Sequence, residues 1–353
     1  MRIVFYSGQV SGHGGTETVL KGMCQGLQQR GHKVQILLTA PSTDSSWEKG
    51  LPVKYVAVPP SYVGFAKVDP LMAHVLFFQH AMRGGPAPDI IVCLGTWQTA
   101  VARAVAESFS KRPKVISWMQ FSLHVMPDSK WLNFADMNIA ISAGIQAQLA
   151  TAFPEVPTPL VYHPVVDQLR FIPRPDITTF VYVGRLMNQQ KRIDTLFTAL
   201  SEVDGDWRLK IIGDGPDEVR LKQQAHDQGI EDKVEWLGWQ SDPWSAIDEA
   251  TALVLPSDFE GFGLVLVEAL SCGIPVIASD CHMGPSDIVR PGTNGWLYPP
   301  RDIASLRGLI QGIIHGALEL PSPESCQETA KRFSYEDQVD NFERVLKTCP
   351  LRN

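Results

Sequence analysis

The sequence predicts an α/β protein built from two doubly wound halves, each with a parallel sheet covered by helices on both faces. Short runs rich in Val and Ile recur throughout the 353 residues and alternate with segments of helical length, a pattern typical of βα units. Prolines interrupt this pattern between residues 154 and 179, and because proline lacks the N–H donor of a sheet, this stretch favours a linker. The length of 353 residues fits two domains, which we expect at residues 1–165 and 166–332.

Eleven strands are predicted from the apolar runs, six before the proline-rich stretch and five after it. The first six are expected at residues 3–6, 34–38, 53–58, 90–94, 115–118 and 138–141. The other five are expected at residues 180–183, 208–212, 234–237, 252–255 and 275–278. Helices are predicted at residues 17–30, 193–200, 264–272 and 333–347. In the first helix Val19, Met23 and Leu27 form one apolar stripe, as expected for a helix that covers a sheet.

Composition excludes several classes of protein. Six cysteines occur without a C-x-x-C pair, which disfavours a zinc site or a disulfide framework and indicates a reducing cytoplasm. No apolar run approaches the roughly 20 residues of a membrane span, and the first apolar stretch is too short for a signal peptide. The net charge of −7 disfavours nucleic-acid binding. Residues 1–165 nevertheless hold 13 Lys and Arg against 9 Asp and Glu, which indicates either an anionic partner or ordinary scatter of surface charge.

The loop after the first strand is rich in glycine. Gly14 and Gly15 allow backbone N–H groups to approach an anion at a helix N-terminus, although a tight turn without a ligand fits equally well. A dinucleotide fingerprint would need glycine where Glu17 stands, and the second predicted strand ends without a ribose-binding carboxylate. A dehydrogenase is therefore disfavoured.

Charged residues follow two strands of the second half. Arg185 and Lys191 come after the strand at 180–183 and are suited to a diphosphate; a solvated basic loop is the alternative. Glu268 lies in an otherwise apolar helix, where a carboxylate is costly unless it is paired. It is therefore a candidate for binding sugar hydroxyls, with an internal Arg partner as the alternative. The Asp204-Gly205-Asp206 triplet is interpreted as turn chemistry rather than a metal site.

Five motifs occur in a fixed order: Gly14-Gly15-x-Glu17, Gly184-Arg185-Leu186 with Lys191, Gly213-Asp214-Gly215-Pro216, Leu237-Gly238-Trp239, and Glu260-x7-Glu268. Together they resemble the retaining nucleotide-sugar glycosyltransferases of family 4 (glycosyltransferase group 1). The resemblance implies the GT-B fold, in which two Rossmann-like domains face a central cleft, an acceptor-side domain at 1–165 and a nucleotide-sugar domain at 166–332. It also implies that the C-terminal segment 333–353 crosses back onto the first domain.

The same resemblance implies roles for individual residues. Arg185 and Lys191 would hold the donor diphosphate, Glu268 the ribose and Glu260 the transferred sugar, which makes Arg185, Lys191 and Glu260 the catalytic candidates. The donor-binding candidates implied are Gly14, Gly15, Arg185, Lys191, Gly238, Trp239, Glu260, Phe262, Gly263, Leu264 and Glu268. No cofactor and no metal are implied, because cationic groups and a helix N-terminus would stabilise the leaving phosphate.

Further motifs resemble the lipopolysaccharide core galactosyltransferases within that family: Val10-Ser11-Gly12, Phe121-Ser122-Leu123, Gly238-Trp239-Gln240-Ser241 and Ser279-Asp280-Cys281. This resemblance implies a hexosyltransferase that moves galactose from UDP-galactose to a sugar of a lipid-linked core oligosaccharide. It further implies a cytoplasmic enzyme in peripheral contact with the inner membrane. The motifs leave uracil, guanine and adenine open as the base.

One position departs from the family pattern. Gln120 stands where many members place a site histidine, and an amide cannot accept a proton or carry charge. Glu17, Gln120 and His124 remain the acceptor-side candidates, with ordinary packing as the alternative for His124. The departure leaves open a weakened or non-catalytic nucleotide-sugar binder. A nucleotide-sugar epimerase or phosphorylase of the same fold is a further alternative.

Overall fold

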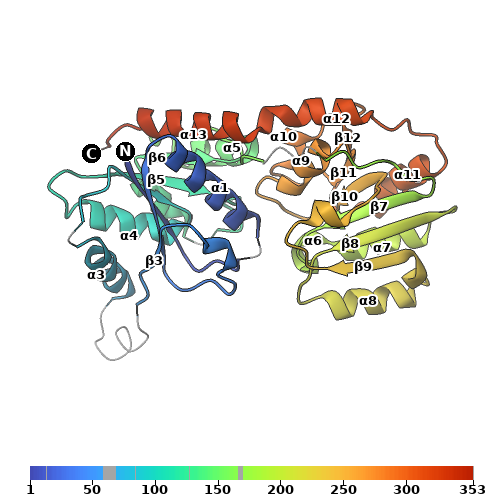
Figure 1. The fold of residues 1–353 in the computed structure, drawn as a ribbon, viewed down its shortest axis with the longest axis horizontal. Helices are drawn as coiled ribbons and strands as arrows, with labels where there is room; N and C mark the ends of the chain where they lie inside the picture. Colours follow the sequence, from blue (N-terminus) through green and yellow to red (C-terminus); the bar gives the residue numbers. More distant parts are fainter. Residues whose placement is uncertain (13, 59–68, 84, 127, 166–169, 353) are drawn as a thin grey trace. The chain divides into compact units, whose positions relative to one another are not determined.

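The chain forms two compact units in a computed structural model that describes residues 1–12, 14–58, 69–83, 85–126, 128–165 and 170–352. Unit 1 comprises Met1–Pro164 and Tyr335–Asn353, and unit 2 comprises Val165–Ser334 (Figure 1). The sequence predicted the first boundary between the units after residue 165, one residue later than observed, and the second after residue 332, two residues earlier than observed. Residues 166–169 of the predicted linker lie outside the described residues.

Unit 1 is organised around a sheet of six parallel strands in the order β3-β2-β1-β4-β5-β6. Its strands are β1 (Arg2–Ser7), β2 (Lys33–Leu38), β3 (Val53–Tyr55), β4 (Ile90–Cys93), β5 (Lys114–Met119) and β6 (Met137–Ala140). Its helices are α1 (Gly15–Gln29), α3 (Pro70–Met82), α4 (Thr96–Ala106), α5 (Ala143–Ala152) and α13 (Tyr335–Thr348), with 3-10 turns η1 (Ser46–Glu48) and η2 (Ser129–Phe134).

Unit 2 repeats this arrangement, with six parallel strands in the order β12-β11-β10-β7-β8-β9. Its strands are β7 (Thr178–Val183), β8 (Trp207–Ile212), β9 (Val234–Gly238), β10 (Ala252–Leu255), β11 (Val276–Ser279) and β12 (Gly295–Tyr298). Its helices are α6 (Asn188–Lys191), α7 (Ile193–Ser201), α8 (Glu218–Asp227), α9 (Leu264–Ser271), α10 (Pro285–Ile288), α11 (Ile303–Ile314) and α12 (Pro323–Ala330). Three 3-10 turns complete it: η3 (Glu231–Lys233), η4 (Pro243–Ala246) and η5 (Lys331–Phe333).

Both sheets have the doubly wound strand order, so the predicted fold class is confirmed. The central strands β4 and β10 are buried at every position, which explains why unbroken apolar runs identified them. Edge strands gave weaker patterns. β3 ends at Tyr55 rather than at residue 58, and two of its three residues are exposed.

Strand β12 is a twelfth strand that the sequence analysis missed. Its sequence Gly-Trp-Leu-Tyr lacks Val and Ile. A Cβ at Gly295 would lie 2.0 Å from the carbonyl oxygen of Val276 on β11, so the backbones approach closely where the strand begins. The signal for this strand was therefore a glycine, and not an apolar run.

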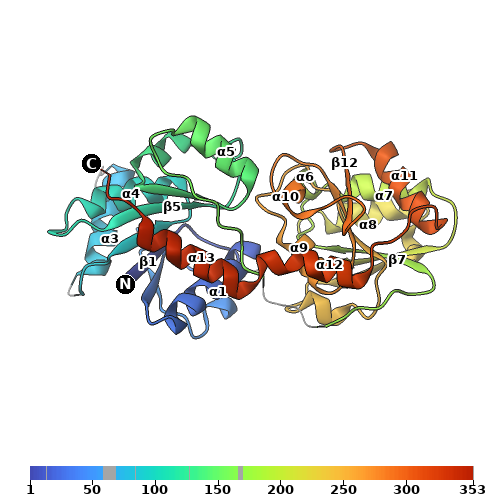
Figure 2. The same cartoon turned by 90° about the horizontal axis from the view of Figure 1, so that it is seen from above.

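The C-terminal helix α13 packs against α1 of unit 1, and the two helices lie side by side in both views (Figures 1 and 2). Tyr335 donates a hydrogen bond to the Gly22 carbonyl at 2.7 Å, and a Cβ at Gly26 would lie 2.8 Å from Val339. The predicted helix at 333–347 begins at Tyr335 instead, because the 3-10 turn η5 occupies Lys331–Phe333 and Ser334 is extended.

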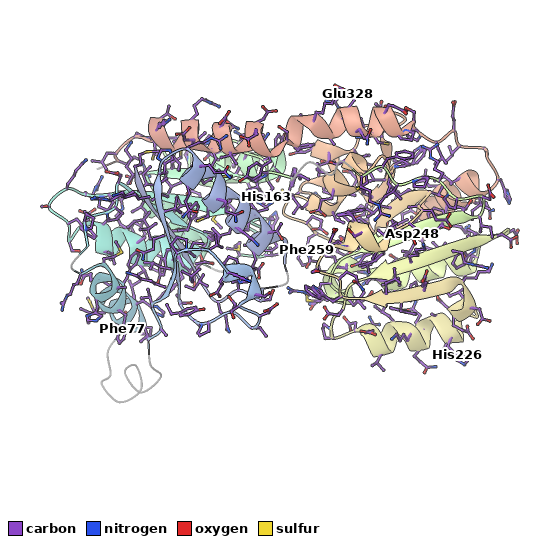
Figure 3. All side chains as sticks on the ribbon, viewed as in Figure 1. Phe77, His163, His226, Asp248, Phe259 and Glu328 are labelled. Carbon is purple, nitrogen blue, oxygen red and sulfur yellow. The ribbon has the colours of Figure 1, made fainter. Side chains whose placement is uncertain are left out.

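Each unit has its own apolar core between sheet and helices (Figure 3). In unit 1, Tyr6 and Phe78 are fully buried with ring centroids 4.7 Å apart, and Phe77 of α3 packs against the same cluster. In unit 2, Trp207 and Phe197 are buried in the corresponding cluster. Of the helices that the structure describes, none has the length and apolar character needed to cross a bilayer.

Candidate functional site

The candidate site in unit 2 lies where the strand order of its sheet reverses. β7 and β10 are hydrogen-bonded neighbours, yet the chain leaves them for opposite sides of the sheet, since β8 follows β7 on one side and β11 follows β10 on the other. In open α/β sheets, ligands bind beyond the carboxyl ends of strands at such a switch point. Arg185 and Lys191 follow β7, and Glu260 follows β10, so the sequence-predicted residues gather at this point.

Lys191 and Glu260 form the central contact of the site. The Lys191 Nζ lies 2.6 Å from Glu260 Oε1, and the two side chains are only 16% and 9% exposed. The Ser257 hydroxyl donates to the same carboxylate oxygen at 2.6 Å. The sequence predicted both charged residues as separate ligand contacts, and the structure pairs them with one another.

Backbone and side-chain hydrogen bonds hold the two loops of this ion pair together. The amide of Gln190 donates from Nε2 to the carbonyl of Phe259 at 3.1 Å, and the Asp258 N–H donates to the Gln190 carbonyl at 2.8 Å. The Ser279 hydroxyl donates to the Ser257 carbonyl. Because these contacts come from α6, from the loop after β10 and from the end of β11, the position of Glu260 is fixed by tertiary structure.

The Glu260 carboxylate influences neighbouring buried groups. Burial, with a contribution from the negative charge of Glu260, raises the pKa of Tyr182 well above its usual value. Burial is likewise the main reason that the pKa of Cys281 rises to about 12, again with a contribution from Glu260. Both groups therefore remain neutral near pH 7 and add no second negative charge beside Glu260.

The glycines of the predicted Gly213-Asp214-Gly215 motif allow two loops to touch. Gly213 has φ +135°, and a Cβ there would lie 2.0 Å from the Gly184 carbonyl oxygen. A Cβ at Gly215 would lie 2.5 Å from the Leu186 carbonyl oxygen. The loop after β8 thus packs closely against the segment that carries Arg185. The Arg185 side chain itself is exposed.

The N-terminus of α9 forms another part of the site. Its N-cap residue Gly263 has φ +92° and provides no side-chain hydrogen bond, so the first N–H groups of the helix are available to an anion. Phe262 is 2% exposed, and a Cβ at Gly284 would lie 2.1 Å from its carbonyl oxygen. Leu264 is the first residue of the helix, which places the three predicted residues 262–264 at one helix terminus.

Glu268 lies one turn further along α9. Its Oε2 accepts a hydrogen bond from Trp244 Nε1 at 3.2 Å. Burial raises the pKa of the Glu268 carboxyl to about 7, against the lowering effect of the Trp244 hydrogen bond. The alternative of an internal Arg partner is therefore not observed among the hydrogen bonds and ion pairs described for this residue.

Gly238 ends β9, and Trp239 follows it at the same edge of the sheet. Gly238 has φ +64°, in the left-handed region that favours glycine, and its carbonyl accepts from the Gly213 N–H at 2.8 Å. Trp239 is 43% exposed, an unusual exposure for the largest side chain. An accessible aromatic face at this edge suits stacking against a planar ring.

In unit 1, Glu17 organises the glycine-rich loop. Its Oε1 accepts from the Gly12 N–H at 2.7 Å and from the Ser11 hydroxyl at 3.0 Å, and the residue is 4% exposed. Gly14 is the N-cap of α1 and Gly15 its first residue. A Cβ at Gly14 would lie 2.7 Å from Glu17 Oε2, so the glycine provides the space into which the carboxylate folds back.

Gln120 follows β5 in unit 1 and is 5% exposed. Its Nε2 donates to the Trp118 carbonyl at 3.2 Å, while its buried Oε1 has no hydrogen-bond partner among the described residues. His124 is exposed, and its backbone N–H donates to the Ser122 hydroxyl at 3.2 Å. An unpaired buried acceptor at the carboxyl edge of the sheet is ready to accept a hydrogen bond from a hydroxyl group.

Several residues of these sites were missed by the sequence analysis. Ser257 and Trp244 hold the two carboxylates, yet neither belongs to a motif; the serine spacing Ser-x-x-Glu was the one available signal. His163 of unit 1 packs edge-on against Trp118 with ring centroids 5.9 Å apart (Figure 3). Burial lowers the pKa of His163 to about 3, so this histidine is neutral at physiological pH.

The structure describes no group of three or more His, Cys, Asp or Glu side chains suited to a metal ion. The Asp204-Gly205-Asp206 triplet forms a turn before β8, at the edge opposite to the site. The Asp204 backbone exchanges two hydrogen bonds with the Gln311 side chain of α11. These two hydrogen bonds agree with the interpretation of the triplet as a structural turn.

Two sequence families match almost the whole chain between them. Residues 14–165 match the glycosyl transferase 4-like domain, and residues 170–333 match the glycosyl transferases group 1. The predicted family resemblance is thereby confirmed.

Individual relatives extend along nearly the full length. The lipopolysaccharide 1,6-galactosyltransferase of Salmonella typhimurium is 34% identical and covers 90% of this chain and 91% of its own. The protein of the same name from Escherichia coli is 31% identical, with 98% of each chain covered.

Among solved structures, the apo form of the lipopolysaccharide outer core galactosyltransferase WaaB superposes with a TM-score of 0.87 at 32% identity, covering 99% of both chains. Anabaena HepE in complex with UDP gives a TM-score of 0.83 at 22% identity, covering 99% of this chain and 100% of its own. At this identity, the likeness to HepE shows the fold alone.

Proposed function

Because the chain belongs to the group 1 glycosyltransferases, we propose that it transfers galactose from UDP-galactose to a sugar of the lipopolysaccharide core, with retention of the anomeric configuration. The observation that carries the proposal is the Lys191–Glu260 pair at the switch point of unit 2. Full-length relatives that bear the name lipopolysaccharide 1,6-galactosyltransferase support the choice of sugar and acceptor.

In the proposed donor complex, Lys191 and Arg185 bind the diphosphate. Lys191 is partly buried and already held in place by Glu260 and by the bonds of Gln190 to the neighbouring loop, so binding requires little ordering of the lysine. Arg185 is exposed and supplies a planar, permanently charged fork that matches phosphate oxygens. The amides of Gly263 and Leu264 at the start of α9 add donors without a side chain.

Glu260 is proposed to accept hydrogen bonds from hydroxyl groups of the transferred sugar. One of its oxygens is occupied by Lys191 and Ser257, which leaves Oε2 for the substrate. Glu268 is proposed to bind the ribose, since Trp244 orients its carboxyl group and no ion pair to it occurs within the described residues. Trp239 and Gly238 are proposed to contact the base.

The transfer breaks the bond between the anomeric carbon and the diphosphate oxygen and forms a bond to the acceptor oxygen. Negative charge grows on the leaving phosphate, while the acceptor hydroxyl loses its proton to a phosphate oxygen. Arg185, Lys191 and the α9 amides stabilise this charge without a metal, and each donor contributes about 3 kcal/mol by comparison with single oxyanion donors. UDP and the extended oligosaccharide leave as products.

Unit 1 is proposed to bind the acceptor. Gln120 offers an unpaired buried acceptor oxygen, which would accept from a sugar hydroxyl. Glu17 holds the loop of Gly14 and Gly15 in shape, and we propose that backbone N–H groups of this loop bind a phosphate of the donor. His124 remains a candidate contact for the acceptor. The acceptor is lipid-linked, so the proposed place of action is the cytoplasmic face of the inner membrane, with peripheral contact.

A second candidate is a nucleotide-sugar binder that does not turn over. The observation in its favour is Gln120, because an amide at this position cannot act as an acid or base. A coupled assay of UDP release with and without a truncated core acceptor separates the two candidates. Transfer requires UDP to appear only when acceptor is present, whereas a binder releases none and an epimerase converts the donor without acceptor.

Donor identity is tested by thermal shift with UDP-galactose, UDP-glucose, GDP-mannose and ADP-glucose. A ligand that binds only the native state raises the melting temperature by mass action. We expect UDP-galactose to give the largest shift and the guanine and adenine donors to give none. An equal shift with all four would contradict the donor assignment, and transfer of glucose in place of galactose would correct it.

A further inference from the structure

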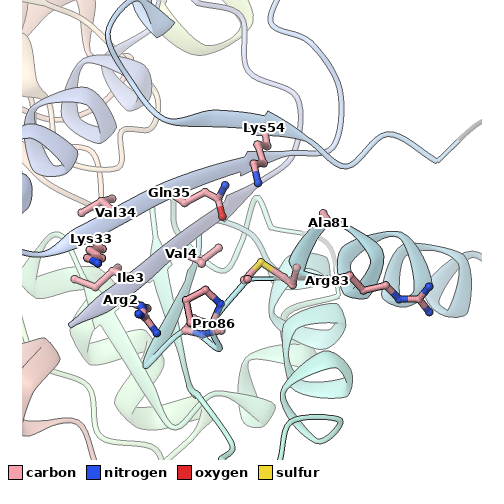
Figure 4. Close-up of a pocket in the computed structure, with 13 residues that line it drawn as sticks. Arg2, Ile3, Val4, Lys33, Val34, Gln35, Lys54, Ala81, Arg83 and Pro86 are labelled. Carbon is pink, nitrogen blue, oxygen red and sulfur yellow. The ribbon is translucent and has the colours of Figure 1, made fainter.

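A pocket of about 270 Å³ opens at the amino-terminal edge of the unit 1 sheet (Figure 4). The first residues of β1 and β2, the middle of β3 and the C-terminal end of α3 line it. The acceptor candidate Gln120 and the loop of Gly14 and Gly15 follow the carboxyl ends of strands in the same sheet. The pocket therefore lies at the edge opposite to the candidate site of unit 1.

Positive charge dominates the pocket. Arg2, Lys33 and Lys54 enter its lining from three neighbouring strands, and none of the described residues that line it is acidic. None of these three side chains forms an ion pair within the described part of the chain. The Asp89 carboxylate accepts from the Arg2 backbone N–H at 2.8 Å and pairs with Lys111 at 3.9 Å.

Not every cationic side chain that lines the pocket points into it. The Arg83 side chain extends away from the other lining residues, whereas Lys54 and Gln35 approach one another across β2 and β3 (Figure 4). Three like charges placed around one cavity without internal partners repel each other, and an anion in the cavity relieves that repulsion. A polar amide, from Gln35, is available beside them as a further donor.

The other walls are apolar. Ala81 and Met82 at the end of α3 and Pro86 after it border the cavity, and all three are at least partly accessible. A ligand that fits both the cationic side and the apolar side of the pocket has an anionic group and an apolar body. A free inorganic ion would leave the apolar wall unused.

We propose that this pocket binds an organic phosphate, with its anionic group between Arg2, Lys33 and Lys54 and its apolar part against Met82 and Pro86. The headgroup of an anionic phospholipid and a soluble phosphate ester share this chemistry. The binding site is separate from the donor site of unit 2, so it does not depend on the proposed transferase activity.

The test uses the full chain and two probes at low ionic strength. Phenyl phosphate is titrated calorimetrically, and flotation is measured with vesicles of phosphatidylglycerol and phosphatidylcholine against vesicles of phosphatidylcholine alone. The variant is Lys33→Glu combined with Lys54→Glu, both at exposed side chains. The matched control is Lys49→Glu combined with Lys130→Glu, which changes the charge of unit 1 equally at exposed positions outside the pocket.

We expect the wild-type chain to bind at least one probe and the pocket variant to bind it about tenfold more weakly or worse, since each cation near an anionic surface contributes about 1 kcal/mol. The control should change binding by less than about twofold by the same reasoning. Binding to anionic vesicles alone assigns a lipid headgroup, and binding to phenyl phosphate as well assigns a soluble ester. Failure of both probes, or equal losses in variant and control, would overturn the proposal. The melting temperature of the pocket variant without ligand should equal that of the control variant, which would show that the pocket variant is folded.

Discussion

Removal of the Lys191 charge should destabilise unit 2 as well as weaken donor binding, because this lysine is the partner of a buried carboxylate. Glu260 is 7% exposed, and Lys191→Ala leaves its charge with the Ser257 hydroxyl as its remaining side-chain partner. Arg185→Ala removes a charge of equal sign from an exposed side chain at the same strand end. The two variants therefore separate the structural effect of the ion pair from the loss of a phosphate contact.

The size of the expected loss in stability follows from the burial of the Lys191–Glu260 pair. Breaking a fully buried ion pair by removing one partner costs about 3–5 kcal/mol. Here the side chains retain 16% and 9% exposure, and Ser257 keeps its hydrogen bond, so we expect about 2 kcal/mol for Lys191→Ala. In a unit of this size that corresponds to a fall in melting temperature of about 4–8 °C. Arg185→Ala should change it by about 1–2 °C at most.

The assay is differential scanning calorimetry of the wild type, Lys191→Ala, Arg185→Ala and the double variant Lys191→Met with Glu260→Gln, with and without UDP-galactose. The double variant removes both charges of this pair and should recover most of the lost stability without ligand. All three variants should lose most of the ligand-induced shift. The reasoning fails if Lys191→Ala melts with the wild type, or if the double variant melts below Lys191→Ala.

Three further predictions concern other parts of the site. Gly213→Ala should lower the free energy of unfolding by about 3 kcal/mol or more, because its Cβ would meet the Gly184 carbonyl oxygen at 2.0 Å. The control is Gly308→Ala in the interior of α11, where a Cβ meets no other atom, and it should raise the free energy of unfolding by about 1 kcal/mol. Similar melting temperatures for the two variants would be inconsistent with the close approach at Gly213. The pKa of Glu268 is raised to about 7 from 4.5, so the native state holds this proton more tightly and stability should fall as pH rises from about 4.5 to 7, by on the order of 2–3 kcal/mol. Glu268→Gln should remove this part of the pH profile from urea-unfolding curves, and an unchanged profile would exclude Glu268 as its source. Transfer activity should survive EDTA, and loss with EDTA that Mn²⁺ restores would argue against charge stabilisation by Arg185 and Lys191 alone.

Much of the fold could be predicted from local pattern. Buried parallel strands such as β4 and β10 are apolar at every position, so their presence is written into short stretches of sequence. Strand β12 escaped because a close backbone approach at Gly295 selects glycine there, and that constraint comes from Val276 on another strand. Likewise, the start of α13 at Tyr335 depends on the preceding 3-10 turn.

The sequence by itself determined which chemical groups follow which strands, because residue type and order are local properties: two cations after one strand, two carboxylates around a later helix, and glycine-rich loops between. Only the tertiary structure decided how these groups meet. Lys191 and Glu260 are 69 residues apart in the chain, and their contact exists because β7 and β10 are neighbours in the sheet. Trp244 and Glu268 are 24 residues apart in the chain and likewise meet only through the fold. A buried charge takes the partner that the packing places beside it, and strand order, not sequence spacing, chooses that partner.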